Sequence, residues 1–263
     1  MDKEYRCTER GEGIMYGIDP RYTVIKKRLE NVKTVVGFVS NKGGVGKSVI
    51  AAVSSLILSA KGYRVGLFDM DFTNPSCHII LGVKDMMPIE EKGIIPPELR
   101  GIKFMSITYY TGENPLPLRG HDITNIILEL LTITRWDSLD FLILDLPPGL
   151  GDEILDAIRF IDKLNIIAVT TPSVLSLSSV SKLIKLLKSV KKNIMGVIVN
   201  EAVPSSIDKN SLERFIGSLN VPLLGMIPFD PSLEKALGNY DKILSTNFKL
   251  HLERIVNNII NSF

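Results

Sequence analysis

The chain has 263 residues, of which 45% are hydrophobic, and its formal net charge is +2. This length suits one large domain, or two small ones, with a sizeable core. The near-neutral charge gives no support for a general nucleic-acid binder, which usually carries a strongly basic domain. No run approaches ~18 consecutive apolar residues, and the start of the chain lacks an apolar signal core. We therefore expect a globular cytoplasmic protein.

Residues 1–32 form a polar, glycine-punctuated N-terminal extension in this interpretation, and residues 33–263 form one domain. In that domain, continuous Val- and Ile-rich runs alternate with amphipathic stretches. Such runs are typical of strands covered on both faces of a parallel sheet. The alternation predicts a doubly wound α/β fold with a mostly parallel sheet flanked by helices. The expected strands are 34–39, 64–68, 102–106, 141–144, 166–169, 194–199 and 222–226, and the expected helices lie near 48–61, 122–134, 153–161, 174–190, 208–218 and 247–262.

A glycine-rich loop follows the first expected strand and precedes a helix, which is the context of a phosphate-binding loop. Lys47 is expected to contact the β- and γ-phosphates, and the Ser48 hydroxyl to ligate Mg²⁺. Backbone N–H groups of such a loop form an anion-binding nest, which the following helix reinforces. The sequence therefore predicts ATP and Mg²⁺ as cofactors. The residues expected to bind the nucleotide here are Gly43, Gly44, Val45, Gly46, Lys47 and Ser48.

The loop departs from the ordinary motif at two positions. Asn41 stands where that motif has its first glycine, six residues before the lysine, and a second lysine, Lys42, precedes the double glycine. This second lysine resembles the one that a group of related ATPases directs to the partner's nucleotide, and the resemblance makes Lys42 a candidate catalytic residue in addition to Lys47.

Carboxylates stand at the ends of two later strands. Asp69 and Asp71 follow the strand 64–68, and Asp145 follows the strand 141–144. Open α/β sheets bind ligands at this edge. Phosphoryl transfer needs a group that orients water and a carboxylate near the metal. We expect Asp71 to orient or activate the attacking water and to lie near the metal, Asp69 to support it, and Asp145 to hold Mg²⁺ through water.

The loop with two lysines resembles that of the ParA, MinD, nitrogenase-iron-protein and Mrp ATPases. Roughly residues 20–260 resemble the Mrp/ApbC family, which includes the eukaryotic cytosolic iron–sulfur scaffold ATPases. The resemblance implies an ATP-bridged homodimer in which Lys42 reaches the partner's nucleotide. It also implies adenine contacts from Asn200 and Pro228, and a role in carrying or delivering iron–sulfur clusters. The stretches that carry the resemblance are 65–71, 75–76, 81–82, 119–120, 136–141, 145–152 and 169–172. One of them contains Pro147-Pro148-Gly149-Leu150-Gly151-Asp152, a loop that could sense the γ-phosphate.

The cysteines depart from the family pattern. Typical members carry Cys-x-x-Cys shortly after the position of Asn200, whereas residues 201–208 contain no cysteine. The sequence has only Cys7 and Cys77, far apart from each other. Thiolates hold iron–sulfur clusters, so no cluster bound by this chain alone is expected. Iron–sulfur client or assembly proteins remain the expected partners.

Two alternative functions remain open, a ParA-like ATPase that cycles on DNA and a MinD-like ATPase that cycles on membranes. The lysines of the expected helix 174–190 could meet DNA, although such a face is more often solvated. The C-terminal helix 247–262 has few of the cations that a membrane-binding helix needs, so we expect it to pack against the sheet. The sequence thus predicts neither a specific nucleic acid nor a membrane as partner.

Overall fold

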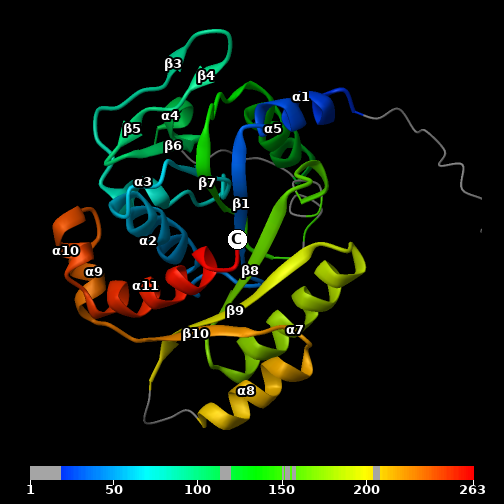
Figure 1. Ribbon diagram of the computed structural model, residues 1–263, viewed down its shortest axis with the longest axis vertical. Helices are drawn as coiled ribbons and strands as arrows, with labels where there is room; N and C mark the ends of the chain where they lie inside the picture. The colour runs from blue at the N-terminus through cyan, green and yellow to red at the C-terminus, as the bar shows by residue number, and fades with distance from the viewer. Residues whose placement is uncertain (1–18, 113–119, 150, 152–154, 156–157, 204–207) are drawn as a thin grey trace, which may run out of the picture.

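The computed structural model describes residues 19–112, 120–149, 151, 155, 158–203 and 208–263. A sheet with the strand order β10-β9-β8-β1-β7-β2-β6-β5 forms its centre (Figure 1). Neighbouring strands are parallel except at the β5 edge. The strands are β1 (Val32–Val39), β2 (Val65–Asp69), β5 (Glu98–Leu99), β6 (Ile102–Ser106), β7 (Leu139–Asp145), β8 (Leu164–Thr170), β9 (Asn193–Ala202) and β10 (Leu223–Pro228), and a separate antiparallel pair joins β3 (Ile89–Glu90) to β4 (Ile94–Ile95).

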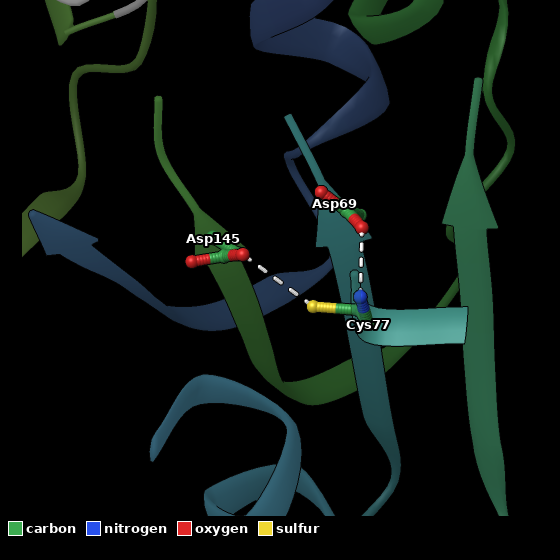
Figure 2. Close-up of side chains that lie close together, drawn as sticks. All are labelled: Asp69, Cys77 and Asp145. Atoms are coloured by element: carbon green, nitrogen blue, oxygen red, sulfur yellow. Dashed lines mark hydrogen bonds between the residues drawn. The ribbon is translucent and has the colours of Figure 1, made fainter. Parts of the chain in front are cut away.

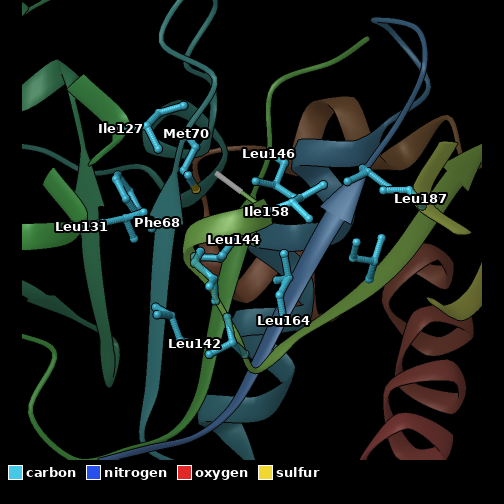
Figure 3. Packing of buried hydrophobic residues seen from close by; sticks show 14 of the residues in the cluster. Phe68, Met70, Ile127, Leu131, Leu142, Leu144, Leu146, Ile158, Leu164 and Leu187 are labelled. Carbon is cyan, nitrogen blue, oxygen red and sulfur yellow. The ribbon is translucent and has the colours of Figure 1, made fainter. Parts of the chain in front are cut away.

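Helices cover both faces of this sheet, which confirms the predicted doubly wound α/β fold. One face packs against α1 (Arg21–Arg28), α5 (Gly120–Ile133), α7 (Val174–Ser189) and α8 (Lys209–Ser218), and Figure 3 shows part of this core. The other face packs against α2 (Lys47–Ala60), α3 (Cys77–Leu81), α9 (Ser232–Ala236), α10 (Tyr240–Leu244) and α11 (Asn247–Ile260), while the short α4 (Thr108–Thr111) follows β6.

All seven expected strands are present; β3 and β4 are additions outside the central sheet, and β5 is an addition within it. It pairs with β6 through a tight hairpin in which Arg100 and Gly101 both have positive φ, 51° and 76°. Two residues of strand give no periodic pattern, so the sequence did not reveal it. The expected helix 153–161 lies partly outside the described residues, and its described end, 158–160, is helical.

Helix α1 lies within the stretch expected to be an extension. Its Ile25 is fully buried, and its Arg28 donates a hydrogen bond to the carbonyl of Thr132 at the end of α5. The described part of that stretch is therefore packed onto the domain. The boundary at residue 32 stays a prediction.

The C-terminal helix α11 packs against α2 and β10. Its apolar side Phe248, Leu252, Ile255, Val256 and Ile259 is buried. This confirms the expected packing against the domain. Among the described residues, no helix combines the length and apolar content that a bilayer span requires.

The register of the sheet sets up the site. Asp69 and Asp145 are the last residues of β2 and β7, and they are direct partners across these two parallel strands. The phosphate loop follows β1, which is the other neighbour of β7. Strand ends and loop therefore meet at one edge of the sheet.

Candidate nucleotide-binding site

The phosphate loop turns through glycines that no other residue could replace without strain. Gly44 and Gly46 have φ of +77° and +82°, a region that favours glycine. A Cβ on Gly46 would lie 2.2 Å from Nδ2 of Asn200. Helix α2 begins directly after this residue, so the loop N–H groups and the helix N-terminus lie together as an anion site requires.

Lys47 forms a buried ion pair with Asp145. Its Nζ lies 2.5 Å from Oδ1 of Asp145, and their side chains are 5% and 0% exposed. A weaker contact of 3.4 Å joins Nζ to Oγ of Ser48. Burial works against the lysine charge, but the Asp145 carboxylate outweighs it and raises the pKa of Lys47. Lys47 is therefore held charged at the point where phosphates are expected.

Asp69 lies beneath this pair and is fully buried. Its carboxylate accepts hydrogen bonds from the backbone N–H groups of Asp71, Ser76 and Cys77. Burial, and then the nearby charge of Asp145, raise the pKa of Asp69 to about 8. Its contacts to the loop that carries Asp71 fit the expected supporting role.

Cys77 faces the same carboxylates (Figure 2). Its Sγ lies 3.5 Å from Oδ2 of Asp145. Burial, together with the charges of Asp69 and Asp145, raises the pKa of the Cys77 thiol well above its ordinary value. In the sequence, Cys77 follows closely after the Asp69–Asp71 stretch.

A cavity of about 270 Å³ lies above the loop and Lys47. Asp71 lines it and is 6% exposed. The hydroxyl of Thr73 and the backbone N–H of Asn74 donate to its Oδ1. Thr73, Asn74 and Ser76 also line the cavity, and the sequence reasoning missed them because turn residues after a strand have no distinctive pattern.

A second cavity, of about 220 Å³, shares Gly46 and Val49 with the first. Asn200 and Pro228 line it, together with Phe229, whose side chain is 60% exposed. Asn200 lies within β9 instead of after it, and its amide donates to the carbonyl of Val45, 3.0 Å away. The expected base contacts thus border the cavity next to the phosphate loop, and Asn200 also supports the loop.

The oxygen donors around the larger cavity fit Mg²⁺. Ser48 and Asp71 line this cavity, and the Asp145 carboxylate is bound to Lys47, which also lines it. Mg²⁺ prefers such hard oxygen ligands beside phosphates. When bound there, the ion would offset the negative charge of the phosphates.

Other expected features lie only partly within the described residues. The backbone N–H of Gly149 donates to the carbonyl of Ser40, so the Pro147–Gly149 turn is tied to the phosphate loop. Lys42 is exposed and lines the cavity edge. Cys7, Leu150, Asp152, Glu153 and residues 204–207 lie outside the described residues.

Comparison with known families gives the same interpretation. A family model described as "ParA: NUBPL iron-transfer P-loop NTPase" matches residues 31–263. The chain belongs to this family. The match confirms the resemblance to the Mrp-type P-loop ATPases, and nucleotide hydrolysis is the general activity of such NTPases.

Curated relatives are similar along most of the chain. An iron-sulfur cluster carrier protein of Aquifex aeolicus is 34% identical over 227 residues, which are 81% of this chain and 62% of the relative. The chain likewise spans 66% of the carrier protein of Rickettsia felis. A cytosolic Fe-S cluster assembly factor, Nubp2 homolog 2 of Drosophila yakuba, is 33% identical over 82% of this chain and 90% of the relative.

Solved structures share the fold. A nucleotide-binding protein of Archaeoglobus fulgidus in complex with ADP has a TM-score of 0.71 and 27% identity, over 85% of this chain and 93% of the other. The septum site-determining protein MinD of Pyrococcus horikoshii has a TM-score of 0.65 and 21% identity, over 86% and 95%. The MinD likeness shows the fold alone.

The buried ion pair predicts a measurable stability effect. Lys47→Met should lower the free energy of unfolding of the nucleotide-free protein by about 3 kcal/mol, because it leaves the Asp145 charge buried without a partner. The double variant Lys47→Met, Asp145→Asn should recover part of this loss. Urea unfolding followed by circular dichroism measures both.

Lys61→Met is the matched control, since the Lys61–Glu253 pair is partly exposed, at 31% and 28%. Its loss should stay below about 1 kcal/mol. If Lys47→Met and Lys61→Met lowered the free energy of unfolding equally, the buried pair would not contribute more to stability than the partly exposed pair.

Proposed function

We propose that this chain is a Mg²⁺-dependent ATPase that works as an ATP-bridged homodimer in iron–sulfur cluster assembly or transfer. The observation that carries the proposal is the cation of Lys47, held at the phosphate loop by Asp145, beside the cavity that Asp71 lines. This combination supplies a charge for the phosphates, a carboxylate near the metal and a group to orient water.

Each residue has a defined task in this proposal. With ATP bound, Lys47 would contact the β- and γ-phosphates in place of Asp145, and the Asp145 carboxylate would then be free to hold Mg²⁺ through water. Ser48 contributes its hydroxyl to the shell of Mg²⁺. Asp71 accepts a hydrogen bond from the attacking water and orients it toward the γ-phosphate. Asn200 and Pro228 border the space for adenine next to Gly46.

Hydrolysis tests the role of Asp71. Asp71→Asn should retain ATP binding and lower turnover by about 10²–10⁴-fold, because the uncharged amide no longer attracts a proton from the water. Phosphate release measures turnover, and calorimetry measures ATP binding. Asp241→Asn, at an exposed position of α10, is the control and should behave as the unaltered protein. Full turnover in Asp71→Asn would remove this residue from the mechanism.

The surface beside the loop supports association of two copies. Lys42 is exposed there, and Val174 and Leu175 at the start of α7 are 81% and 71% exposed. Helix α7 follows the carboxyl end of β8, so these apolar side chains lie at the same edge of the sheet as the phosphate loop. A second copy that covers this edge would bury them and bring its own Lys42 toward the nucleotide.

Association should depend on nucleotide. In light scattering, ATP with Mg²⁺ should shift the protein from monomer toward dimer, and Lys42→Ala should lose hydrolysis more than ATP binding. Lys191→Ala is the control, because Lys191 follows the far end of α7, away from the loop. A monomer at every nucleotide state and at high concentration argues against the bridged dimer.

Two of the lysines in and just after α7 make contacts within the domain, which reduces the support for the DNA-cycling alternative. Lys188 donates to the carbonyls of Leu219 and Asn220, just beyond α8, and Lys192 donates to that of Ile161. These two lysines therefore join secondary-structure elements within the domain. The proposed role in iron–sulfur metabolism has the support of the family and of the relatives' names.

The cluster itself is expected to come from a partner. Residues 201–208 lack the Cys-x-x-Cys pair, and Cys77 is buried beside Asp145. After anaerobic reconstitution with iron and sulfide, the purified protein should retain no stoichiometric acid-labile sulfide. Sulfide and iron bound in a four-to-four ratio per dimer, and lost in Cys7→Ser or Cys77→Ser, would overturn this expectation.

A further inference from the structure

Three potential metal ligands converge beneath the phosphate loop. One ligand atom each from Asp69, Cys77 and Asp145 lies within 4.8 Å of the other two. All three side chains are fully buried, and Figure 2 shows the thiol directed toward Asp145. They come from the last residues of β2 and β7 and the first residue of α3, so a rigid part of the sheet holds two of the three ligands.

The spacing suits one small ion. Two ligands of a tetrahedral ion, at about 2.0–2.3 Å from the metal, lie about 3.3–3.8 Å from each other. Sγ of Cys77 and Oδ2 of Asp145 are 3.5 Å apart. The pair could therefore share an ion with little rearrangement, and a carboxylate oxygen of Asp69 lies within 4.8 Å of both ligand atoms.

A cation already occupies the neighbouring position. Nζ of Lys47 lies 2.5 Å from Oδ1 of Asp145, and both side chains are buried. Positive charge is thus favoured at this point of the fold. When phosphates draw Lys47 away, the buried carboxylate of Asp145 needs another cation.

We propose that Asp69, Cys77 and Asp145 form a binding site for a thiophilic divalent ion of the Zn²⁺, Co²⁺ and Fe²⁺ class, and that Cys77 gives this site its preference over Mg²⁺. A thiolate selects such ions, whereas Mg²⁺ requires oxygen ligands in an octahedral arrangement. On binding, the thiol proton passes to solvent and the sulfur lone pair forms the bond to the metal. No oxidation state changes. The link to nucleotide rests on the proposed function, but metal binding itself does not.

Cobalt titration of the nucleotide-free full-length protein tests the site. Co²⁺ bound by a thiolate absorbs in the near ultraviolet, so the unaltered protein should develop this band with one Co²⁺ per chain. Excess Mg²⁺ should leave the band in place. Cys77→Ser should remove the band and weaken Co²⁺ binding at least about tenfold, since even supporting residues of metal sites contribute 10–100-fold. Cys7→Ser, at the other cysteine, should keep the band.

A second measurement does not depend on any variant. X-ray absorption of the Zn²⁺-loaded unaltered protein should show one sulfur ligand at about 2.3 Å. Absence of the cobalt band, its persistence in Cys77→Ser, its loss in Cys7→Ser, or oxygen and nitrogen ligands alone around Zn²⁺ would overturn the proposal. Because nucleotide is absent, these outcomes are independent of ATP hydrolysis. A protein that binds Co²⁺ through Cys77 but never hydrolyses ATP would refute the proposed function alone.

Discussion

The ion pair of Lys47 and Asp145 is the interaction on which the candidate site depends. Removing two charges from water costs several kcal/mol per ion, so such a pair persists only where geometry and further hydrogen bonds compensate. Here the geometry comes from the sheet, because β7 lies between β1 and β2. Its last residue therefore faces the phosphate loop on one side and the Asp69 carboxylate on the other. The fold therefore places one buried carboxylate between the cation of the phosphate loop and a second buried carboxylate.

Close backbone contacts hold the rest of the site in register. Asn200 supports the carbonyl of Val45 and fills the space that a Cβ on Gly46 would need. Gly82 directly follows the last residue of α3, and a Cβ on it would lie 2.3 Å from the carbonyl oxygen of Gly238. Helix α3 is therefore fixed between the carboxylates at its start and the segment after α9 at its end. Through these contacts, the cavity above the phosphate loop and the adjoining cavity that Asn200 lines share one framework.

The sequence predicted those parts that local patterns determine. Continuous apolar runs predicted the parallel strands, and the glycine-rich run before Lys47 predicted the loop between β1 and α2. The docking of Ile25 and the β5 hairpin were missed, because both depend on a partner distant in sequence or on two turn residues. The contact between Cys77 and Asp145 could not be derived either, since it depends on the register of β2 against β7 and spans 68 positions.

The same register connects metal choice to nucleotide. Lys47 and a metal ion bound by Cys77 would compete for the Asp145 carboxylate, so each would weaken the binding of the other. Phosphates that attract Lys47 reduce this competition and should favour the metal, and by reciprocity a bound metal should favour the phosphates. A magnesium ion would bind only through the carboxylate oxygens, whereas the thiol would also allow softer ions to bind. In a chain that belongs to a family described as iron-transfer NTPases and lacks cysteine at 201–208, the access of this buried thiol to metal would then depend on the nucleotide.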